Sequence, residues 1–231
     1  ALEGLQRIRA REPMVRSFRD LFLLNSGLAR RTMEQVFGTL AERHGVPILA
    51  GSYFAWDDRE GEVRLVNRAV LFGVDGRVAY SQDKVFLTPF EQELLGVAAG
   101  RLEDAAPFPL RGLAGHRVGL TICRDTFFGQ WQERLAGSLL WIDIKANGER
   151  FNAEERERFL RALPARIAEG AVPYGLTVCL VGGLLDMIWE GESSLVRGDA
   201  RGGFEFLARA ADPAAEQVLL LEIPVDPSGG P

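Results

Sequence analysis

Residues 118–128 read Val118-Gly-Leu-Thr-Ile-Cys123-Arg-Asp125-Thr-Phe-Phe128, an apolar strand that ends at a cysteine just before a turn into an expected helix. Strand ends of this kind are where α/β sheets present reactive groups. A helix N-terminus beside Cys123 would favour its thiolate form. The alternative interpretation is a buried structural cysteine, the usual role of an isolated one. Cys179, in the apolar run Leu176-Thr-Val-Cys-Leu-Val, fits that alternative, and we interpret it as a core residue.

A second stretch carries two opposite charges around a proline. It reads Lys84-Val-Phe-Leu-Thr-Pro-Phe-Glu91 and follows an expected strand, so it is interpreted as an ordered loop. Such a loop can turn both charged heads toward one pocket while its apolar side chains anchor it. The alternative is a surface loop with two solvated charges, since most charged residues are exposed. Glu3, close to the start of the sequence, indicates nothing by itself.

Apolar periodicity predicts a helix over residues 29–44 and a second helix that opens at Asn152. Glu155, three residues after Asn152, completes a pattern that resembles a capping box. The second helix is expected to run toward Glu169 with a break near Pro164. Apolar β-rich runs predict strands over residues 46–54, 63–74, 77–80, 117–123, 138–144, 175–181, 193–196 and 217–223. The fold class that follows is α/β (α+β), with mixed strand directions.

Composition restricts the classes of protein. The chain has 231 residues, 47% of them hydrophobic, which predicts a single domain over residues 1–226 and a flexible tail over 227–231. A net charge of −5 without a long basic run argues against a nucleic-acid partner. No apolar run reaches the roughly 18 residues that span a bilayer, so no membrane partner is expected. Two cysteines and two histidines predict neither a disulfide framework nor a zinc site, which favours a cytoplasmic setting.

Together these stretches resemble the nitrilase, or carbon–nitrogen hydrolase, superfamily. That family has a Glu after a first strand, a Lys in a loop of the kind Lys-x-x-Leu-x-Pro, and a Cys in a Gly-x-x-Ile-Cys-x-Asp-x-x-Phe segment. Glu3, Lys84 with Glu91, and Cys123 occur here in the same order. The resemblance covers nearly the whole chain, and the ordered combination favours it over the structural interpretations given above.

The resemblance implies a four-layer α-β-β-α sandwich whose subunits pair through helices into a homodimer or a higher homo-oligomer. It implies an amidase-like hydrolase that cleaves a non-peptide amide, or a nitrile, of a small molecule through a thioester on Cys123. Glu3 would be the general base, and Lys84 would stabilise the oxyanion. Glu91 would position Lys84 or the substrate amine. No cofactor and no metal are implied.

Two further residues follow from the same resemblance. The backbone N–H of Arg124 would also stabilise the oxyanion. Arg124 and Phe128 are the expected substrate-binding residues, with a pair between Arg124 and Asp125 as the alternative for the arginine.

The sequence also departs from the family. Phe128-Gly129-Gln130 replaces the usual Phe-Pro-Glu, Leu2 stands where a Pro is usual, and Gly182-Gly183 stands where an Asn is often found. The strand that would precede Glu3 is absent from the sequence, so we expect the first strand to be missing. These departures concern the substrate preference and the helix geometry more than the triad.

Two other functions fit the same residues. One is an acyltransferase or a glutaminase that uses the same triad. The other is a binding or regulatory protein with this fold and weakened catalysis, which the departures support. A thiol redox protein ranks below both, because Cys123 and Cys179 are not arranged as Cys-x-x-Cys.

Overall fold

The computed structural model of the protein describes residues 17–58, 61–113, 115–184 and 187–225. The chain divides into two compact units, Ala1–Ala105 and Ala106–Pro231, each with its own sheet and helices. One domain over residues 1–226 stays a prediction. The expected tail over 227–231 lies outside the described residues.

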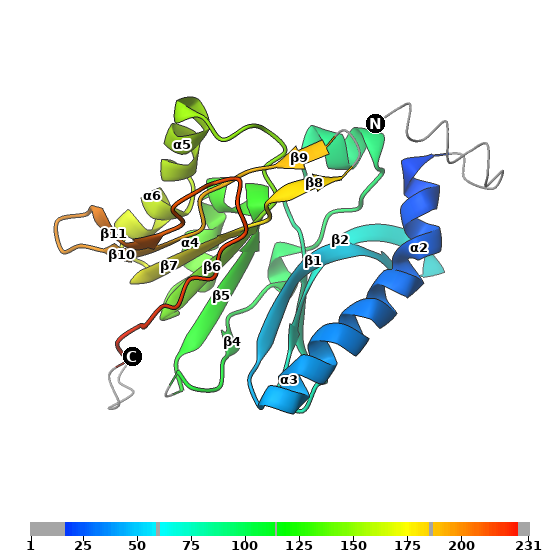
Figure 1. Ribbon diagram of the computed structural model, residues 1–231, viewed down its shortest axis with the longest axis horizontal. Coiled ribbons are helices and arrows are strands. Elements are labelled where there is room, and N and C mark those ends of the chain that lie inside the picture. Colours follow the sequence, from blue (N-terminus) through cyan, green and yellow to red (C-terminus); the bar gives the residue numbers. More distant parts are fainter. Residues whose placement is uncertain (1–16, 59–60, 114, 185–186, 226–231) are drawn as a thin grey trace. The chain divides into compact units, whose positions relative to one another are not determined.

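The first unit contains a three-stranded antiparallel sheet with β2 in the centre. Its strands are β1 (Ile48–Asp57), β2 (Arg64–Phe72) and β3 (Val78–Asp83), drawn in pale blue and cyan in Figure 1. The turn signal Asp75-Gly76 joins β2 to β3, as expected. The backbone N–H of Gly73 donates to the carbonyl oxygen of Arg77 at 2.8 Å, and Gly76 has a φ of 73°, which glycine adopts without steric cost.

A long helical segment covers this sheet. It consists of α2 (Phe18–Met33), a π-helical turn η1 (Glu34–Gly38) and α3 (Thr39–His44). The hydroxyl of Ser17 caps its start by accepting the backbone N–H of Asp20 at 3.2 Å. The helix expected over 29–44 therefore begins earlier, at Phe18.

Two apolar clusters fill the first unit. One has Leu65, Leu87, Leu95 and Val97 at its centre, and the other has Ala41, Val70 and Phe72. The remaining segments of this unit are short: η3 (Phe90–Leu94) is a π-helical turn and η4 (Leu102–Asp104) is a 3₁₀ turn.

The second unit contains a six-stranded sheet in the order β11-β10-β7-β6-β5-β4. The central strands β5, β6 and β7 are parallel, and the flanking pairs are antiparallel, so the predicted mixed directions are confirmed. The strands are β4 (Phe108–Pro109), β5 (Arg117–Ile122), β6 (Leu140–Lys145), β7 (Tyr174–Cys179), β10 (Ser194–Gly198) and β11 (Phe204–Arg209). A separate hairpin pairs β8 (Gly182–Leu184) with β9 (Met187–Trp189).

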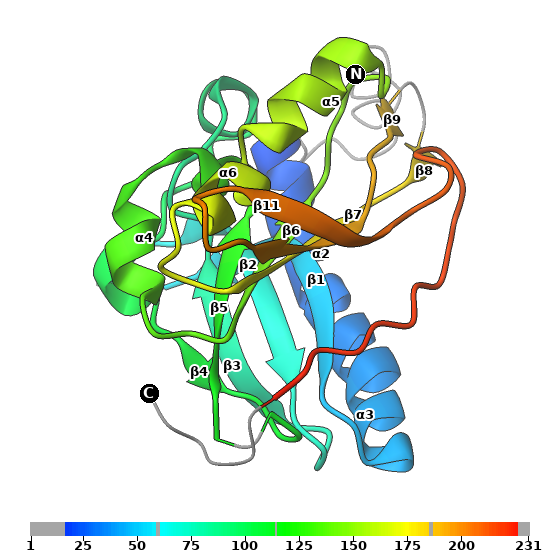
Figure 2. The ribbon, with the colours of Figure 1, turned by 90° about the vertical axis from the view of Figure 1, so that its left-hand side faces the viewer.

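Three short helices belong to this unit: α4 (Gln130–Leu135), α5 (Ala153–Leu160) and α6 (Leu163–Ala168), seen from a second side in Figure 2. The side chain of Asn152 caps α5 by accepting the N–H of Glu155 at 3.0 Å, as the sequence predicts. The expected break also occurs, because α6 starts anew with Pro164 in its first turn. Gly175 on β7 allows α6 to pack closely, since a Cβ there would lie 2.6 Å from Cγ1 of Ile167.

The two faces of the six-stranded sheet differ in chemistry. Alternate side chains of a strand share a face, and the register aligns Gly119, Trp141 and Gly175 in one row. Leu135 and Ile167 approach the two glycines of this row, which is therefore the face that the helices cover. The same face continues toward the carboxyl ends of the strands with polar side chains: Thr121, Asp143, Lys145, Thr177 and Cys179.

One predicted strand is wrong, and four strands in the described part of the chain were not predicted: β4, β8, β9 and β11. Residues 217–223 form no strand, and the side chains of Val218 and Leu220 are 97% and 94% exposed. The edge strand is instead Phe204–Arg209, which pairs with β10. Within the described residues, none of the helices is both long and apolar enough to cross a bilayer.

Candidate functional site

Lys84 and Glu91 form a buried ion pair just after β3. Nζ of Lys84 lies 2.6 Å from Oε2 of Glu91, and the two side chains are 3% and 9% exposed. The loop between them is anchored by Leu87, which packs in the cluster with Leu65. The loop thus brings both charged groups together inside the first unit, away from solvent.

Both carboxylate oxygens of Glu91 accept hydrogen bonds from other groups as well. Nδ2 of Asn67 donates to Oε1 at 3.0 Å. The backbone N–H and the hydroxyl of Thr88 donate to Oε2 at 2.8 and 2.9 Å. A carboxylate with this many donors is held in its charged form and in one orientation, and it binds the ammonium of Lys84.

The backbone of Lys84 is fixed from both sides. Its N–H donates to the carbonyl oxygen of Asn67 at 2.8 Å, and its own carbonyl oxygen accepts the N–H of Gly100 at 2.8 Å. A Cβ on Gly100 would lie 2.6 Å from the backbone oxygen of Asp83, so a residue without a side chain is needed for this close approach. The lysine therefore leaves a rigid strand end rather than a free loop.

Burial alone would raise the pKa of Glu91, but the ammonium of Lys84 and the donors from Thr88 and Asn67 outweigh it. The pKa of Glu91 is consequently held below its ordinary value of 4.5. A carboxyl whose pKa is lower in the folded chain than in the unfolded chain contributes stability above the unfolded value and loses it as pH falls.

We therefore expect the Lys84–Glu91 pair to stabilise the protein fully above about pH 4.5 and progressively less below it. The measurement is the free energy of unfolding in urea for the parent chain and for Glu91→Gln, each over a series of pH values. The difference between the two should narrow as the pH falls below that value. A gap that stays constant or widens in acid would contradict the assigned direction.

Cys123 follows the last residue of β5 with a left-handed backbone. Its φ is 55°, and among the described residues it is the one non-glycine with a positive φ. Such a conformation costs roughly 1–3 kcal/mol and is characteristic of functional sites. The turn that follows, η5 (Cys123–Phe127), is a 3₁₀ turn, and it leads into α4 at Gln130, as the sequence predicts. The hydroxyl of Thr126 donates to the carbonyl oxygen of Cys123 at 2.9 Å.

A second buried ion pair lies beside this turn. Oδ2 of Asp143 is 2.6 Å from Nζ of Lys145, and the two side chains are 0% and 4% exposed. Nζ of Lys145 also donates to the carbonyl oxygen of Cys123 at 3.1 Å and to the hydroxyl of Thr126 at 3.0 Å. Thr121 donates to Asp143 at 3.3 Å. The pair thus ties β6 to the turn that carries the cysteine.

The two expected substrate-binding residues contact each other. The guanidinium of Arg124 lies 5.6 Å from the ring centroid of Phe128, a cation–π distance. Asp125, the alternative partner of Arg124, is buried and accepts the backbone N–H of Ile122 at 3.1 Å. Substrate binding by Arg124 and Phe128 and the oxyanion role of the Arg124 N–H stay predictions.

Cys179 lies at the end of β7 in a different environment from Cys123. Burial raises the pKa of Cys179 to about 12, despite the nearby charge of Lys145. A thiol with this pKa is protonated at neutral pH, which makes it a poor nucleophile. This supports the interpretation of Cys179 as a structural residue.

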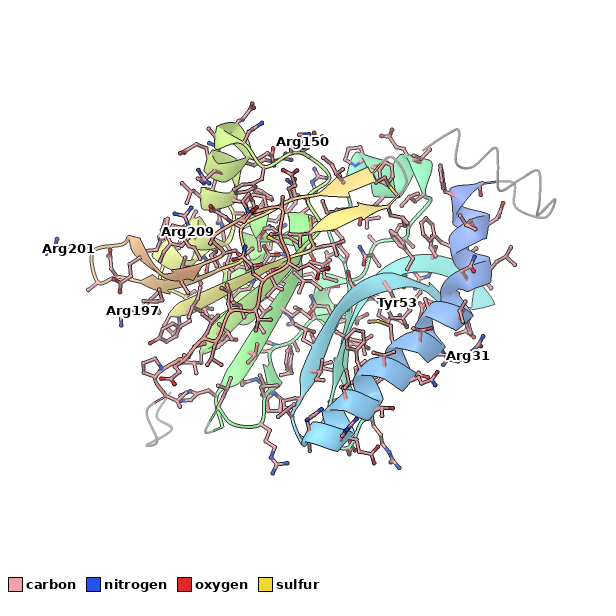
Figure 3. The ribbon with its side chains drawn as sticks, viewed as in Figure 1. Arg31, Tyr53, Arg150, Arg197, Arg201 and Arg209 are labelled. Carbon is pink, nitrogen blue, oxygen red and sulfur yellow. The ribbon has the colours of Figure 1, made fainter. Side chains whose placement is uncertain are left out.

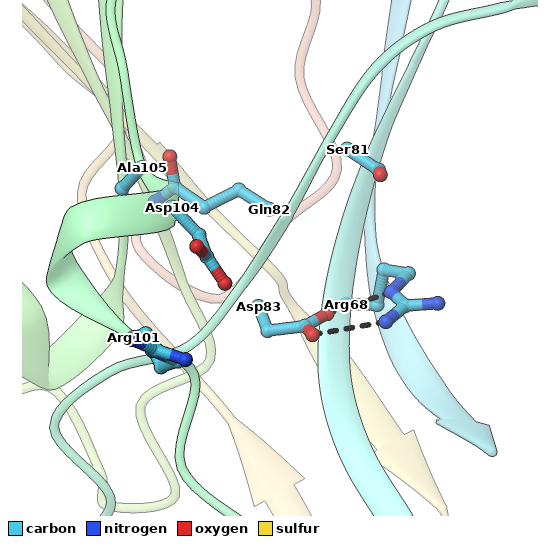
Figure 4. Close-up of a pocket in the computed structure, with 7 residues that line it drawn as sticks. All are labelled: Arg68, Ser81, Gln82, Asp83, Arg101, Asp104 and Ala105. Atoms are coloured by element: carbon cyan, nitrogen blue, oxygen red, sulfur yellow. Dashed lines mark hydrogen bonds and ion pairs between the residues drawn. The ribbon is translucent and has the colours of Figure 1, made fainter. Parts of the chain in front are cut away.

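The first unit also has a small pocket, shown in Figure 4. Arg68 and Asp83 stand on one side of it, and Arg101, Asp104 and Ala105 on the other. The guanidinium of Arg68 bonds Asp83 at 2.6 and 2.9 Å and Asp57 at 3.1 Å, so its charge is already neutralised. No group of three His, Cys, Asp or Glu side chains in the described part of the chain could hold a metal ion.

Comparison with known proteins gives a result at the level of structure. No family model and no curated protein sequence matches the chain. Among solved structures, Saccharomyces cerevisiae Nit3, a member of branch 10 of the nitrilase superfamily, superposes with a TM-score of 0.63 at 20% identity, over 80% of this chain and 62% of that one. A carbon–nitrogen hydrolase from Helicobacter pylori G27 superposes with a TM-score of 0.62 at 24% identity, over 83% and 66%. The chain has the fold of the nitrilase superfamily.

An amidase from Nesterenkonia sp. AN1 has the same nitrilase fold, with a TM-score of 0.58 at 19% identity over 80% of this chain and 66% of that one. The chain spans less than two thirds of the length of these three nitrilase-fold proteins. The predicted nitrilase-like α/β fold is confirmed by this match. The stacking of four layers stays a prediction.

The nitrilase-fold interpretation missed several residues that the structure places around the candidates. Glu3 lies outside the described residues, so its position stays a prediction. Asn67 and Thr88, which hold Glu91, were not singled out, and neither were Asp143 and Lys145. A signal for the last two exists in the sequence, because Leu140-Trp-Ile-Asp-Ile-Lys145 places two opposite charges at alternate positions of an apolar strand.

Proposed function

We propose that the protein is an amidase-like carbon–nitrogen hydrolase that acts on a non-peptide amide, or a nitrile, of a small molecule. The residues assigned to the reaction are Cys123, Lys84, Glu91 and Glu3. Their convergence on one substrate is part of the proposal.

The observation that carries the proposal is the left-handed cysteine at the carboxyl end of a central parallel strand in a nitrilase fold. Cys123 is half-buried, follows β5 directly and has a φ of 55°. Strained backbone costs folding free energy, and at the end of a strand it can present a side chain above the edge of the sheet. A purely structural cysteine needs no such conformation, as Cys179 at the end of β7 illustrates.

The proposed reaction runs in two stages. Glu3 takes the thiol proton of Cys123, the sulfur attacks the carbonyl carbon of the amide, and the C–N bond breaks as the nitrogen leaves with the proton from Glu3. The acyl group stays on sulfur as a thioester. Glu3 then takes a proton from water, the resulting hydroxide attacks the thioester, and the acid leaves as the thiol is restored. For a nitrile, the first adduct is a thioimidate, and water releases the nitrogen from it.

Lys84 and Glu91 have a separate role in both stages. The ammonium of Lys84 would stabilise the negative oxygen that forms in each attack, together with the N–H of Arg124. Glu91 already accepts hydrogen bonds from Lys84, Asn67 and Thr88, and its pKa is held below its ordinary value, so it is a weaker base than an ordinary glutamate. This argument separates the two glutamates and gives the base role to Glu3.

The test is intact-protein mass spectrometry after brief mixing with a panel of small amides and nitriles. Ammonia released as an acyl adduct forms on Cys123, followed by decay of that adduct in water with release of the acid, supports a hydrolase. An adduct that decays only when an amine acceptor is added supports the acyltransferase alternative. No adduct with any compound, in a chain that binds some of them, would favour the non-catalytic binding protein.

We extend the proposal to the setting of the protein. The enzyme works in the cytoplasm, which the small number of cysteines favours, and the resemblance implies a homodimer or higher homo-oligomer that needs no cofactor.

A further inference from the structure

Lysine is rare in this chain. It occurs at positions 84 and 145, whereas arginine supplies the other 25 of the 27 basic residues. Arginines of the second unit, such as Arg197 and Arg201, point outward from the strand ends in Figure 3. Both lysines, in contrast, are buried and each forms an ion pair of 2.6 Å. The two lysines thus each lie inside a unit and pair with a buried carboxylate.

The proposed reaction uses Lys84 and leaves Lys145 without a function. Lys145 ends β6, which lies between the strand that leads to Cys123 and the strand that ends at Cys179. The register pairs Ile122 with Ile144 and Lys145 with Cys179. Lys145 therefore lies level with Cys123 and Cys179 at the carboxyl ends of three neighbouring strands.

The three hydrogens of the ammonium match three oxygen acceptors. These are the carboxylate of Asp143 at 2.6 Å, the hydroxyl of Thr126 at 3.0 Å and the carbonyl oxygen of Cys123 at 3.1 Å. Two aromatic rings lie near the same ammonium, with centroids at 5.3 Å for Phe127 and 5.5 Å for Phe159. These contacts fix the ammonium in place, and they hold the strained turn against β6 at Cys123 and Thr126.

We propose that Lys145 is the positioning residue of Cys123, and that it holds the left-handed turn and keeps a permanent positive charge close to the nucleophilic sulfur. Asp143 has a supporting role, because it keeps that charge in a buried place. The inference deepens the proposed hydrolase function and rests on it for its catalytic meaning, although its test does not need turnover.

The titratable groups that face Lys145 come from three strands. They are Asp143 on its own strand, Cys123 after β5 and Cys179 on β7. Burial lowers the pKa of Lys145, but the charges of Asp143, Cys123 and Cys179 outweigh burial and leave that pKa above its ordinary value. Lys145 therefore stays charged over the pH range in which a thiol titrates. Its nearest charged partner is the carboxylate of Asp143, at 2.6 Å.

The test measures how fast iodoacetamide alkylates Cys123 as a function of pH. Every protein carries Cys179→Ser, so that Cys123 is the one cysteine present. The double variant Asp143→Asn/Lys145→Met removes both charges and leaves no buried charge unpaired. The matched control is Lys145→Arg, which keeps the positive charge. Circular dichroism establishes that each variant is folded.

In the double variant we expect alkylation near neutral pH to be several-fold slower and its midpoint to lie at higher pH. Lys145 donates directly to the carbonyl oxygen of Cys123, whereas Asp143 reaches the turn only through the ammonium and the hydroxyl of Thr126, so the loss of the cation outweighs the loss of the carboxylate. Lys145→Arg should keep the midpoint close to that of the parent. A folded double variant with the parent midpoint would overturn the proposal, because a lysine with only a structural role would leave the thiol titration unchanged.

A second measurement decides the matter even where the double variant does not fold. A chain with ¹³C at the Cε of lysine gives two side-chain signals, and the one absent from Lys145→Arg belongs to Lys145. That signal should shift at the midpoint at which Cys123 becomes reactive, and the shift should disappear once Cys123 is alkylated. A Lys145 signal that stays constant through this midpoint would also overturn the proposal.

The outcomes for the two proposals are separable. A shifted alkylation midpoint without any acyl adduct would keep the role of Lys145 and remove the hydrolase. An acyl adduct with an unshifted midpoint would do the reverse.

Discussion

Replacing Cys123 with alanine is expected to abolish turnover and the acyl adduct and to leave the fold unchanged. In the proposed reaction the sulfur forms the thioester, so in this variant no atom remains to carry the acyl group. Alanine carries the same steric cost as cysteine at a φ of 55°, because both have a Cβ, so the free energy of unfolding should change little. The measurement is ammonia release from a responsive amide, together with a urea unfolding curve.

The matched control for this variant is Cys179→Ser. Cys179 stands at the equivalent end of β7 with its thiol protonated, so its loss should alter packing and leave the turnover rate close to that of the parent. Full hydrolysis by Cys123→Ala, or complete loss of activity in a well-folded Cys179→Ser, would each refute the assignment of the nucleophile.

Replacing Lys84 with methionine is expected to reduce both turnover and stability. Removal of one oxyanion donor typically lowers turnover by about 10²–10³-fold. The same change leaves Glu91 buried, 9% exposed and without its cation, and breaking such a pair costs roughly 3–5 kcal/mol. The measurements are turnover at saturating substrate and the free energy of unfolding in urea.

A double variant separates the two effects. Lys84→Met/Glu91→Leu removes the buried pair as a whole, so it should recover most of the lost stability, because an apolar pair of similar size is well tolerated in such places. It should recover none of the turnover, since the ammonium is still missing. Turnover that returned together with stability would show that Lys84 acts only through the fold.

Arg68→Met provides the control for a lost ion pair in the same sheet. Arg68 pairs with Asp83, one register position from Asn67 and Lys84, and therefore points to the opposite face of the sheet. This variant should lose stability without a comparable loss of turnover. If Arg68→Met lost as much turnover as Lys84→Met, the lost turnover would come from damage to the sheet rather than from the missing ammonium of Lys84.

The sequence predicted the central elements of the fold because their signals are local. The apolar run that ends at Cys123 forms β5, and the cap at Asn152 and the break at Pro164 both appear where expected. The apolar pattern of the sequence gave a wrong prediction where hydrogen bonding to a neighbouring strand decides whether a segment forms a strand. Residues 217–223 are as apolar as a strand but have no ladder partner, whereas β11, with its alternating polar residues, pairs with β10.

The candidate site was predictable only in part for a similar reason. Lys84, Glu91 and Cys123 belong to an ordered set of motifs that a sequence can show. Asp143 and Lys145 do not, since a charged residue in a sequence is ordinarily solvated. Their burial depends on the neighbouring strands and on the helices that cover that face, and neither can be inferred from the residues of β6 alone.

The left-handed backbone at position 123 also bears on how such a chain can drift. Glycine adopts a φ of 55° without steric cost, so a glycine there would gain roughly 1 kcal/mol of folding free energy and lose the sulfur. Folding stability therefore favours glycine at position 123, whereas the proposed catalysis requires cysteine there. A descendant that no longer needs the proposed catalysis could accept glycine at this position. Return to an active enzyme would then require the less stable cysteine to be restored.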